Sequence, residues 1–116
     1  ALHADLEFLA AARALDGGDG AGALRHMRAA RRHALDGTAP LAYVAASVAE
    51  SALAEVLGDD RAAYGSLATA YATLGDLVGR PLSAATFEGP LRELRDRWGA
   101  DRFAAAKAAY EATRRR

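Results

Sequence analysis

The chain has 116 residues, of which 52% are hydrophobic, and its 15 basic residues are balanced by 15 acidic residues. This length fits one domain that can bury a core of its own, and a net charge of zero gives no support for a nucleic-acid-binding surface. The chain has no cysteine, which excludes a disulfide framework, a thiol nucleophile and thiolate metal ligands.

The composition favours helices. Alanine dominates the hydrophobic residues, and it is the best helix former because it loses no side-chain entropy. Runs of isoleucine, valine and threonine, which would indicate strands, are nearly absent. No apolar run approaches the roughly 20 residues that span a bilayer. We therefore expect an all-α, cytoplasmic protein with a thin, closely packed core. The preference for arginine over lysine would fit a GC-rich bacterial genome.

The first predicted hairpin covers residues 2–36. An apolar stripe with a 3.6-residue period predicts a helix up to Leu15. Gly17 and Gly18 end this helix, and Asp19 is a suitable N-cap for the second helix of the hairpin.

The second predicted hairpin covers residues 39–78. Thr38 can cap its first helix, and Pro40 is tolerated in the first turn because the N–H that it lacks would be unpaired there. A hinge at Gly58 follows, and Asp59 can cap the next helix.

The first helix of this second hairpin is apolar over a wide arc. Two apolar rows run along it, the first formed by Leu41, Val44, Val48 and Ala52 and the second by Ala45, Ala49, Leu53 and Val56. An arc of this width predicts packing on more than one side. The remainder is a narrow polar strip of Tyr43, Ser47 and Glu50, which we expect on the open side of the helix.

The third predicted hairpin covers residues 83–113. Its first helix begins at Ser83, but Gly89 and Pro90 interrupt it, since a proline inside a helix costs about 3 kcal/mol. We expect either a kink at this point or a fresh start with Gly89 as the N-cap. After a turn at Gly99, the last helix completes the hairpin.

Glycine hinges recur along the chain. Gly18, Gly58 and Gly99 lie 40 and 41 residues apart. A fixed period in this range is typical of stacked helical repeats, in which each unit is a helix–turn–helix.

Small and large residues alternate in the same way in two of the predicted second helices. One set is Ala23, Met27 and Ala30, and the other is Ala63, Leu67 and Ala70. With the hinges, this pattern resembles the tetratricopeptide repeat family. The resemblance implies a small right-handed α-solenoid of about six helices. It also implies that the first helices of the hairpins form a concave surface that holds a peptide of a partner. The alternative is an alanine-rich helical bundle with coincidental spacing.

Two surfaces are candidate partner-binding sites. The concave surface would present Phe8, Tyr43, Ser47 and Glu50, with Glu93 and Arg97 from the third hairpin. Such a mixed-charge groove with aromatic anchors suits a peptide. The other surface would present Arg25, Arg28 and Arg32, which share one side of their helix and can meet phosphates or an acidic partner. The simpler interpretation is that Phe8 belongs to the core and that the charged side chains are merely solvated.

No set of residues indicates catalysis. His26 and His33 lie two helical turns apart, whereas a metal shared on a helix needs ligands three or four residues apart. Carboxylate pairs lack the context that acid–base chemistry requires. We therefore expect no metal, no cofactor and no enzymatic activity. The expected function is that of a protein–protein interaction module, a scaffold or adaptor that binds a peptide or protein, with nucleic acid and membrane as unlikely partners.

Two alternative functions stay open. The first is self-association into a homodimer, through a last helix that exposes Phe103 or Tyr110. The second is a ligand-binding or enzymatic helical bundle with a pocket among Tyr64, Tyr71 and Trp98. A large enclosed apolar pocket would favour the bundle, and a filled alanine core beside an open groove would argue against it.

Overall fold

The computed structural model describes the backbone of residues 2–36 and 39–114, and the side chains of residues 9–36 and 39–114. These residues form six helices: α1 (Leu2–Asp16), α2 (Gly20–Asp36), α3 (Pro40–Val56), α4 (Asp60–Val78), α5 (Arg80–Trp98) and α6 (Ala100–Arg114). The described part of the chain contains no strand, so the prediction of an all-α fold is confirmed.

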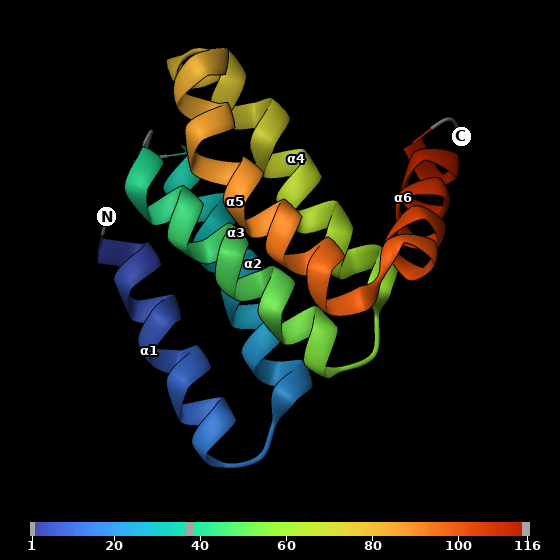
Figure 1. Cartoon of the computed structure of the whole chain (residues 1–116). Coiled ribbons are helices and arrows are strands. Elements are labelled where there is room, and N and C mark those ends of the chain that lie inside the picture. The colour runs from blue at the N-terminus through green and yellow to red at the C-terminus, as the bar shows by residue number, and fades with distance from the viewer. Residues whose placement is uncertain (1, 37–38, 115–116) are drawn as a thin grey trace.

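The helices form two layers (Figure 1). In that view α1, α3 and α5 lie nearer the viewer and α2 and α4 lie behind them. Helix α6 lies at the right of the view. Each helix packs against the next one in the chain, and α6 also packs against α4. Successive helices run in opposite directions, so α2 and α4 run the same way on either side of α3.

The turns at Gly18 and Gly58 have the same structure. Both glycines have φ of 79°, in the left-handed region that favours glycine. In both turns the next residue is an aspartate, Asp19 or Asp59, whose Oδ1 accepts from a backbone N–H three residues on, at 2.8 and 3.0 Å. Both predicted N-caps are confirmed. Thr38 lies outside the described residues, and the N-cap of α3 is Ala39, which makes no side-chain capping bond.

The turn at Gly99 is of a different kind. It matches the turn at Gly79, since each glycine is a single residue between two helices, with φ of 86° and 102°. Each glycine donates its N–H to a carbonyl four residues earlier. The α1–α2 and α3–α4 turns therefore share one geometry, and tighter turns join α4 to α5 and α5 to α6.

Helix α5 is continuous, so of the two alternatives expected at Gly89 and Pro90, a kink or a fresh start, the fresh start is wrong. It begins at Arg80, with Pro81 in the first turn, and has Pro90 in its interior. Phe87 and Leu94, which are 0% and 1% exposed, lie seven residues apart and anchor one face of α5 in the core on either side of the proline. This packing holds the helix together despite the backbone hydrogen bond that a proline removes.

Alanine makes the core thin, as expected. Many of the residues with no exposed surface are alanines: Ala23, Ala30, Ala34, Ala46, Ala54, Ala63 and Ala70. The larger buried side chains, among them Tyr43, Leu67 and Phe87, belong to one cluster that α2–α5 share.

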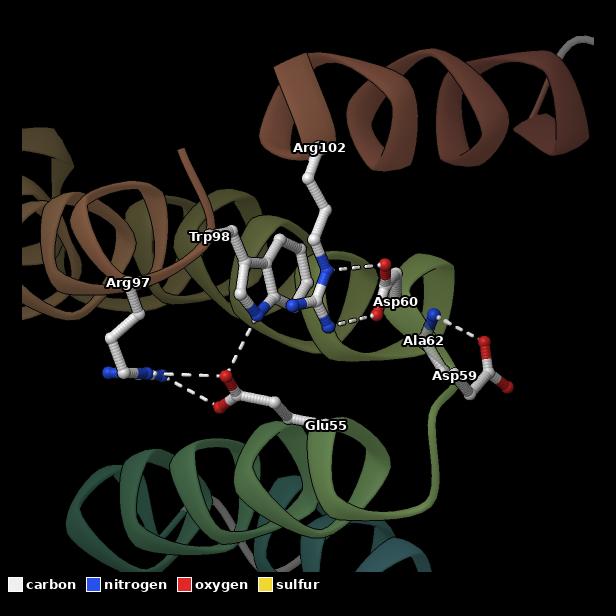
Figure 2. Close-up of polar contacts among 7 residues, drawn as sticks. All are labelled: Glu55, Asp59, Asp60, Ala62, Arg97, Trp98 and Arg102. Atoms are coloured by element: carbon white, nitrogen blue, oxygen red, sulfur yellow. Dashed lines mark hydrogen bonds and ion pairs between the residues drawn. The ribbon is translucent and has the colours of Figure 1, made fainter. Parts of the chain in front are cut away.

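A polar cluster fixes the start of α6 (Figure 2). Glu55, at the end of α3, accepts hydrogen bonds from Arg97 Nη2 at 2.7 Å and from Trp98 Nε1 at 2.8 Å. Arg102 lies over the Trp98 ring at 4.5 Å and makes two 2.8 Å bonds to Asp60. The hydrogen bond from Arg97 is the largest cause that lowers the pKa of Glu55, and the bond from Arg102 does the same for Asp60. The cluster ties the turn between α5 and α6 to the turn between α3 and α4.

Helix α6 lies close to α4 at Gly65. A Cβ atom added at this glycine would be 2.7 Å from Cδ1 of Tyr110, so only glycine fits beneath the ring. Tyr64 meets Phe103 and Tyr110 edge to face, at centroid distances of 5.3 and 5.6 Å. Phe103 and Tyr110 are half-buried on α4, which is at odds with an exposed aromatic face on the last helix.

Candidate interaction surfaces

Helix α3 is packed with its polar strip inward. Tyr43, Ser47 and Glu50 are 2%, 0% and 4% exposed, so the expectation that this strip lies on the open side of the helix is wrong. The strip's polar groups have partners inside the fold: Ser47 Oγ donates to the carbonyl of Tyr43 at 2.8 Å, and Glu50 forms ion pairs with two arginines of α2. Among the described residues Glu50 Oε2 accepts no hydrogen bond, so the nearby charge of Arg31 is what compensates its burial.

Small side chains make up most of the buried face of α3, beside Tyr43 and Glu50. The inward face also carries Ala46, Ser51 and Ala54, and Ser51 Oγ donates to the carbonyl of Ala63 on α4 at 2.7 Å. These small residues let α2 and α4 approach α3 closely, which branched side chains would prevent. Leu41, Val48 and Val56 are left on the outer face of α3, whereas Val44 and Leu53 pack partly against the core.

The outer face of α3 is an exposed apolar stripe. Leu41 and Val56 are 87% and 83% exposed, and Val48 between them is 38% exposed. Ala45 and Ala52 complete the stripe and are exposed as well. These five residues are spaced at i, i+4, i+7, i+11 and i+15, which places them on one side of the helix. We call them the α3 stripe.

A shallow notch lies beside the α3 stripe, between α3 and α5. It has a volume of about 190 Å³ and is lined by Val48 and Ala52 of the stripe and by Pro90, Glu93 and Arg97 of α5, among others. The sequence placed Glu93 and Arg97 on the same surface as the first helices of the hairpins, and the structure does bring them beside α3. The apolar stripe thus has a charged border.

The second surface is a groove between α2 and α4. Its first hollow, of about 230 Å³, is lined by Arg28 and Arg31 of α2, Glu50 of α3, Arg61 and Thr69 of α4, and Tyr110 of α6, with several smaller groups. A second hollow of about 360 Å³ shares Arg28, Arg31 and Thr69 with the first, and adds Arg32, Tyr43 and Thr73. Since they share three residues, the hollows form one continuous depression, which we call the arginine groove.

The predicted site residues therefore lie in different places. Arg28, Arg32, Tyr43 and Glu50 come together in the arginine groove. Arg25 is exposed on α2, Ser47 is buried, and the side chain of Phe8 lies outside the described residues. Sequence reasoning missed Arg61 and assigned Tyr110 to an exposed face of the last helix, because nothing local in the chain indicates that α4 and α6 lie beside α2.

Tyr64, Tyr71 and Trp98, which were expected around one pocket, have different neighbours in the structure. Tyr64 packs against α6, and Trp98 hydrogen-bonds Glu55. Tyr71 lines a hollow near the turn between α4 and α5, with Gly75 and Arg80 among its neighbours. Within the described ranges, no three histidine, aspartate or glutamate side chains gather closely enough to hold a metal ion.

Comparisons with protein-family models, with curated proteins and with solved structures found no match for this chain. Among the described residues, none of the helices combines the length and the apolar character that a membrane crossing needs.

Proposed function

We propose that this protein is a non-enzymatic protein–protein interaction module that accepts a helix of its partner on the α3 stripe. The observation that carries the proposal is the inverted packing of α3, with Leu41 and Val56 more than four-fifths exposed while Ser47 and Glu50 are buried. A contiguous exposed apolar patch bordered by polar residues is typical of an interaction surface.

The form of the stripe favours a helical partner. Two small residues, Ala45 and Ala52, alternate with the three larger ones, so the stripe offers ridges and shallow gaps to the side chains of an apposed helix. Helices commonly dock in this way by laying an apolar face on a surface with matching spacing. The notch at α5 adds a charged edge that can set the direction of the partner.

The repeated turn geometry supports a helical-repeat architecture of the tetratricopeptide type. The turns at Gly18 and Gly58 are equivalent, and both are followed by an aspartate N-cap. In such a right-handed solenoid, the first helices of the hairpins, α1, α3 and α5, would form the partner-binding side. The α3 stripe would lie at the centre of that side.

The test compares two charge-insertion variants. In the variant Leu41→Glu/Val56→Glu, both positions are almost fully exposed, so the fold and its melting temperature should be retained. The control is Leu77→Glu on α4, which is 44% exposed and lies outside the stripe. Light scattering over a range of concentrations measures self-association, and mass spectrometry identifies proteins retained from a lysate of the source.

The proposal requires an association that the Leu41→Glu/Val56→Glu variant loses and the Leu77→Glu variant keeps. A dimer lost in this pattern would identify the partner as a second copy, and a retained protein lost in this pattern would identify a different chain. If wild type and both variants behave alike in both measurements, the α3 stripe is not an interaction surface.

A further inference from the structure

The arginine groove is separate from the α3 stripe. The side chains that line the groove favour a ligand different from the partner proposed for the stripe. The two surfaces lie on different sides of α3: the stripe is its outer face, and the groove lies between α2 and α4, over the buried face of α3. Glu50, on that buried face, forms part of the groove.

Glu50 holds two guanidinium groups in place. Arg28 Nε lies 3.3 Å from Glu50 Oε1, and Arg31 Nη1 lies 3.1 Å from Oε2. The carboxylate is 5% exposed, whereas the side chains of Arg28 and Arg31 are 48% and 26% exposed. A guanidinium has five N–H donors, and among the described residues Glu50 is the polar partner of both arginines. Most of their donors are therefore available to a ligand, on side chains whose position is already fixed.

The groove has an excess of positive charge. Its first hollow contains the guanidinium groups of Arg28, Arg31 and Arg61 and the carboxylate of Glu50, which leaves two positive charges uncompensated. Arg61 comes from the other wall and is held by one contact, from its Nη1 to Thr113 Oγ1 at 3.4 Å. A ligand with two negative charges would neutralise this hollow, whereas a single carboxylate would leave it positive.

Hydroxyl groups add further donors. Thr69 and Tyr110 share one hydrogen bond across the hollow, so the hydroxyl that accepts this bond keeps its own proton for a ligand. Thr73 extends the row along α4 into the second hollow. With about 230 Å³, the first hollow is smaller than the roughly 300–1,000 Å³ of a site for a drug-sized ligand, which suits a single compact group.

We propose that the first hollow of the arginine groove binds a phosphate monoester group. Such a group carries about two negative charges at neutral pH and several strong acceptor oxygens, which matches the charge excess and the donors described above. Forked guanidinium donors are well suited to phosphate oxygens. The second hollow is continuous with the first and has room for the remainder of the ligand. The phosphate belongs either to a small molecule or to a phosphorylated residue of a partner segment.

The test is a titration of isotope-labelled protein at fixed ionic strength, followed by NMR. The probes are inorganic phosphate, phosphoserine and a short phosphoserine peptide, with serine and acetate as controls. We expect the phosphorylated probes to shift resonances of α2 and α4, and acetate to bind at least tenfold more weakly. A tenfold advantage of the peptide over phosphoserine would indicate a partner segment, and equal affinity would indicate a small molecule.

Three variants locate the site. Arg61→Gln and Arg31→Gln should each lower the affinity for phosphoserine at least tenfold, and Arg61→Gln leaves both ion pairs of Glu50 in place in case Arg31→Gln unfolds. Arg25→Gln, an exposed change on the same helix as Arg31 but outside the groove, should alter affinity less than twofold. Equal binding of acetate and phosphoserine, or full affinity in Arg61→Gln, would overturn the proposal. The variant Leu41→Glu/Val56→Glu should bind phosphoserine normally, which separates this site from the α3 stripe.

Discussion

The buried carboxylate of Glu50 makes a sharp prediction about stability. Its two partners, Arg28 and Arg31, are partly exposed, while Glu50 is 4% exposed. Removing both arginines leaves a largely buried carboxylate without a charged partner, and an uncompensated buried charge costs about 3–5 kcal/mol. Removing the carboxylate leaves two guanidinium groups that water can hydrate, so Glu50→Gln should cost only about 1 kcal/mol.

The ranking of variants follows from these exposures. Arg28 is the more exposed partner, so Arg28→Gln should cost less than Arg31→Gln, and the double variant should cost the most. The triple variant Arg28→Gln/Arg31→Gln/Glu50→Gln has no buried charge, and it should be more stable than the double variant although it carries one more substitution.

Urea unfolding followed by far-UV circular dichroism measures these differences. With a slope of roughly 2 kcal/mol per molar, a loss of about 4 kcal/mol lowers the midpoint by about 2 M urea. A Glu50→Gln variant as unstable as the double arginine variant would refute the reasoning. So would a triple variant no more stable than the double, because the arginines would then not be compensating the carboxylate.

Three further substitutions test the packing and the polar cluster. Gly65→Ala should lower the free energy of unfolding, because the new methyl group meets the tyrosine ring of α6. Gly75→Ala in the same helix makes only ordinary contacts and should raise the free energy of unfolding by up to about 1 kcal/mol. Thermal unfolding measures both variants, and an equal gain in stability would contradict the close approach of α6 to Gly65. Ala70→Leu should cost about 1–3 kcal/mol, since Ala70 is 0% exposed and the added atoms overpack the core; an unchanged melting temperature would show that the site has spare room. The lowered pKa of Glu55 stabilises the fold above the ordinary glutamate pKa of 4.5, and this contribution is lost as the pH falls through the lowered pKa. Glu55→Gln should therefore lower the melting temperature at about pH 7 and have a smaller effect at about pH 3, and an equal deficit at both would exclude the charge of Glu55 as the cause.

The local features of the fold could be predicted from the sequence. Asp19 and Asp59 follow glycine turns, and each caps its helix as a short polar side chain in that position should. The signals for these turns lie within a few residues, so no tertiary information is needed. Pro90 is the exception among local signals, because tertiary packing of Phe87 and Leu94 holds a helix together where propensity alone predicts a break.

The surfaces could not be predicted in the same way. Hydrophobic periodicity assigns Leu41 and Val56 to the inside of α3 and Glu50 to the outside, and the structure has the reverse. Polarity was the wrong criterion here, because the buried face of α3 combines small residues with Tyr43 and with Glu50, whose charge is compensated by arginines of α2. The arginine groove depends on helices distant in sequence, and no pattern within α2 indicates that Arg61 lies opposite Arg28.

The inverted packing of α3 also limits what the α3 stripe can do alone. Complete burial of a leucine or valine side chain contributes about 1.5–3 kcal/mol, and Leu41 and Val56 leave most of this unrealised. A partner that covers both recovers at most about 3–6 kcal/mol, whereas association costs an estimated 4–15 kcal/mol in lost freedom of motion. The contact must therefore extend beyond α3. The notch lined by Glu93 and Arg97 adjoins the α3 stripe and offers both a hollow and charged side chains. We therefore expect a partner helix to lie across α3 and α5 together.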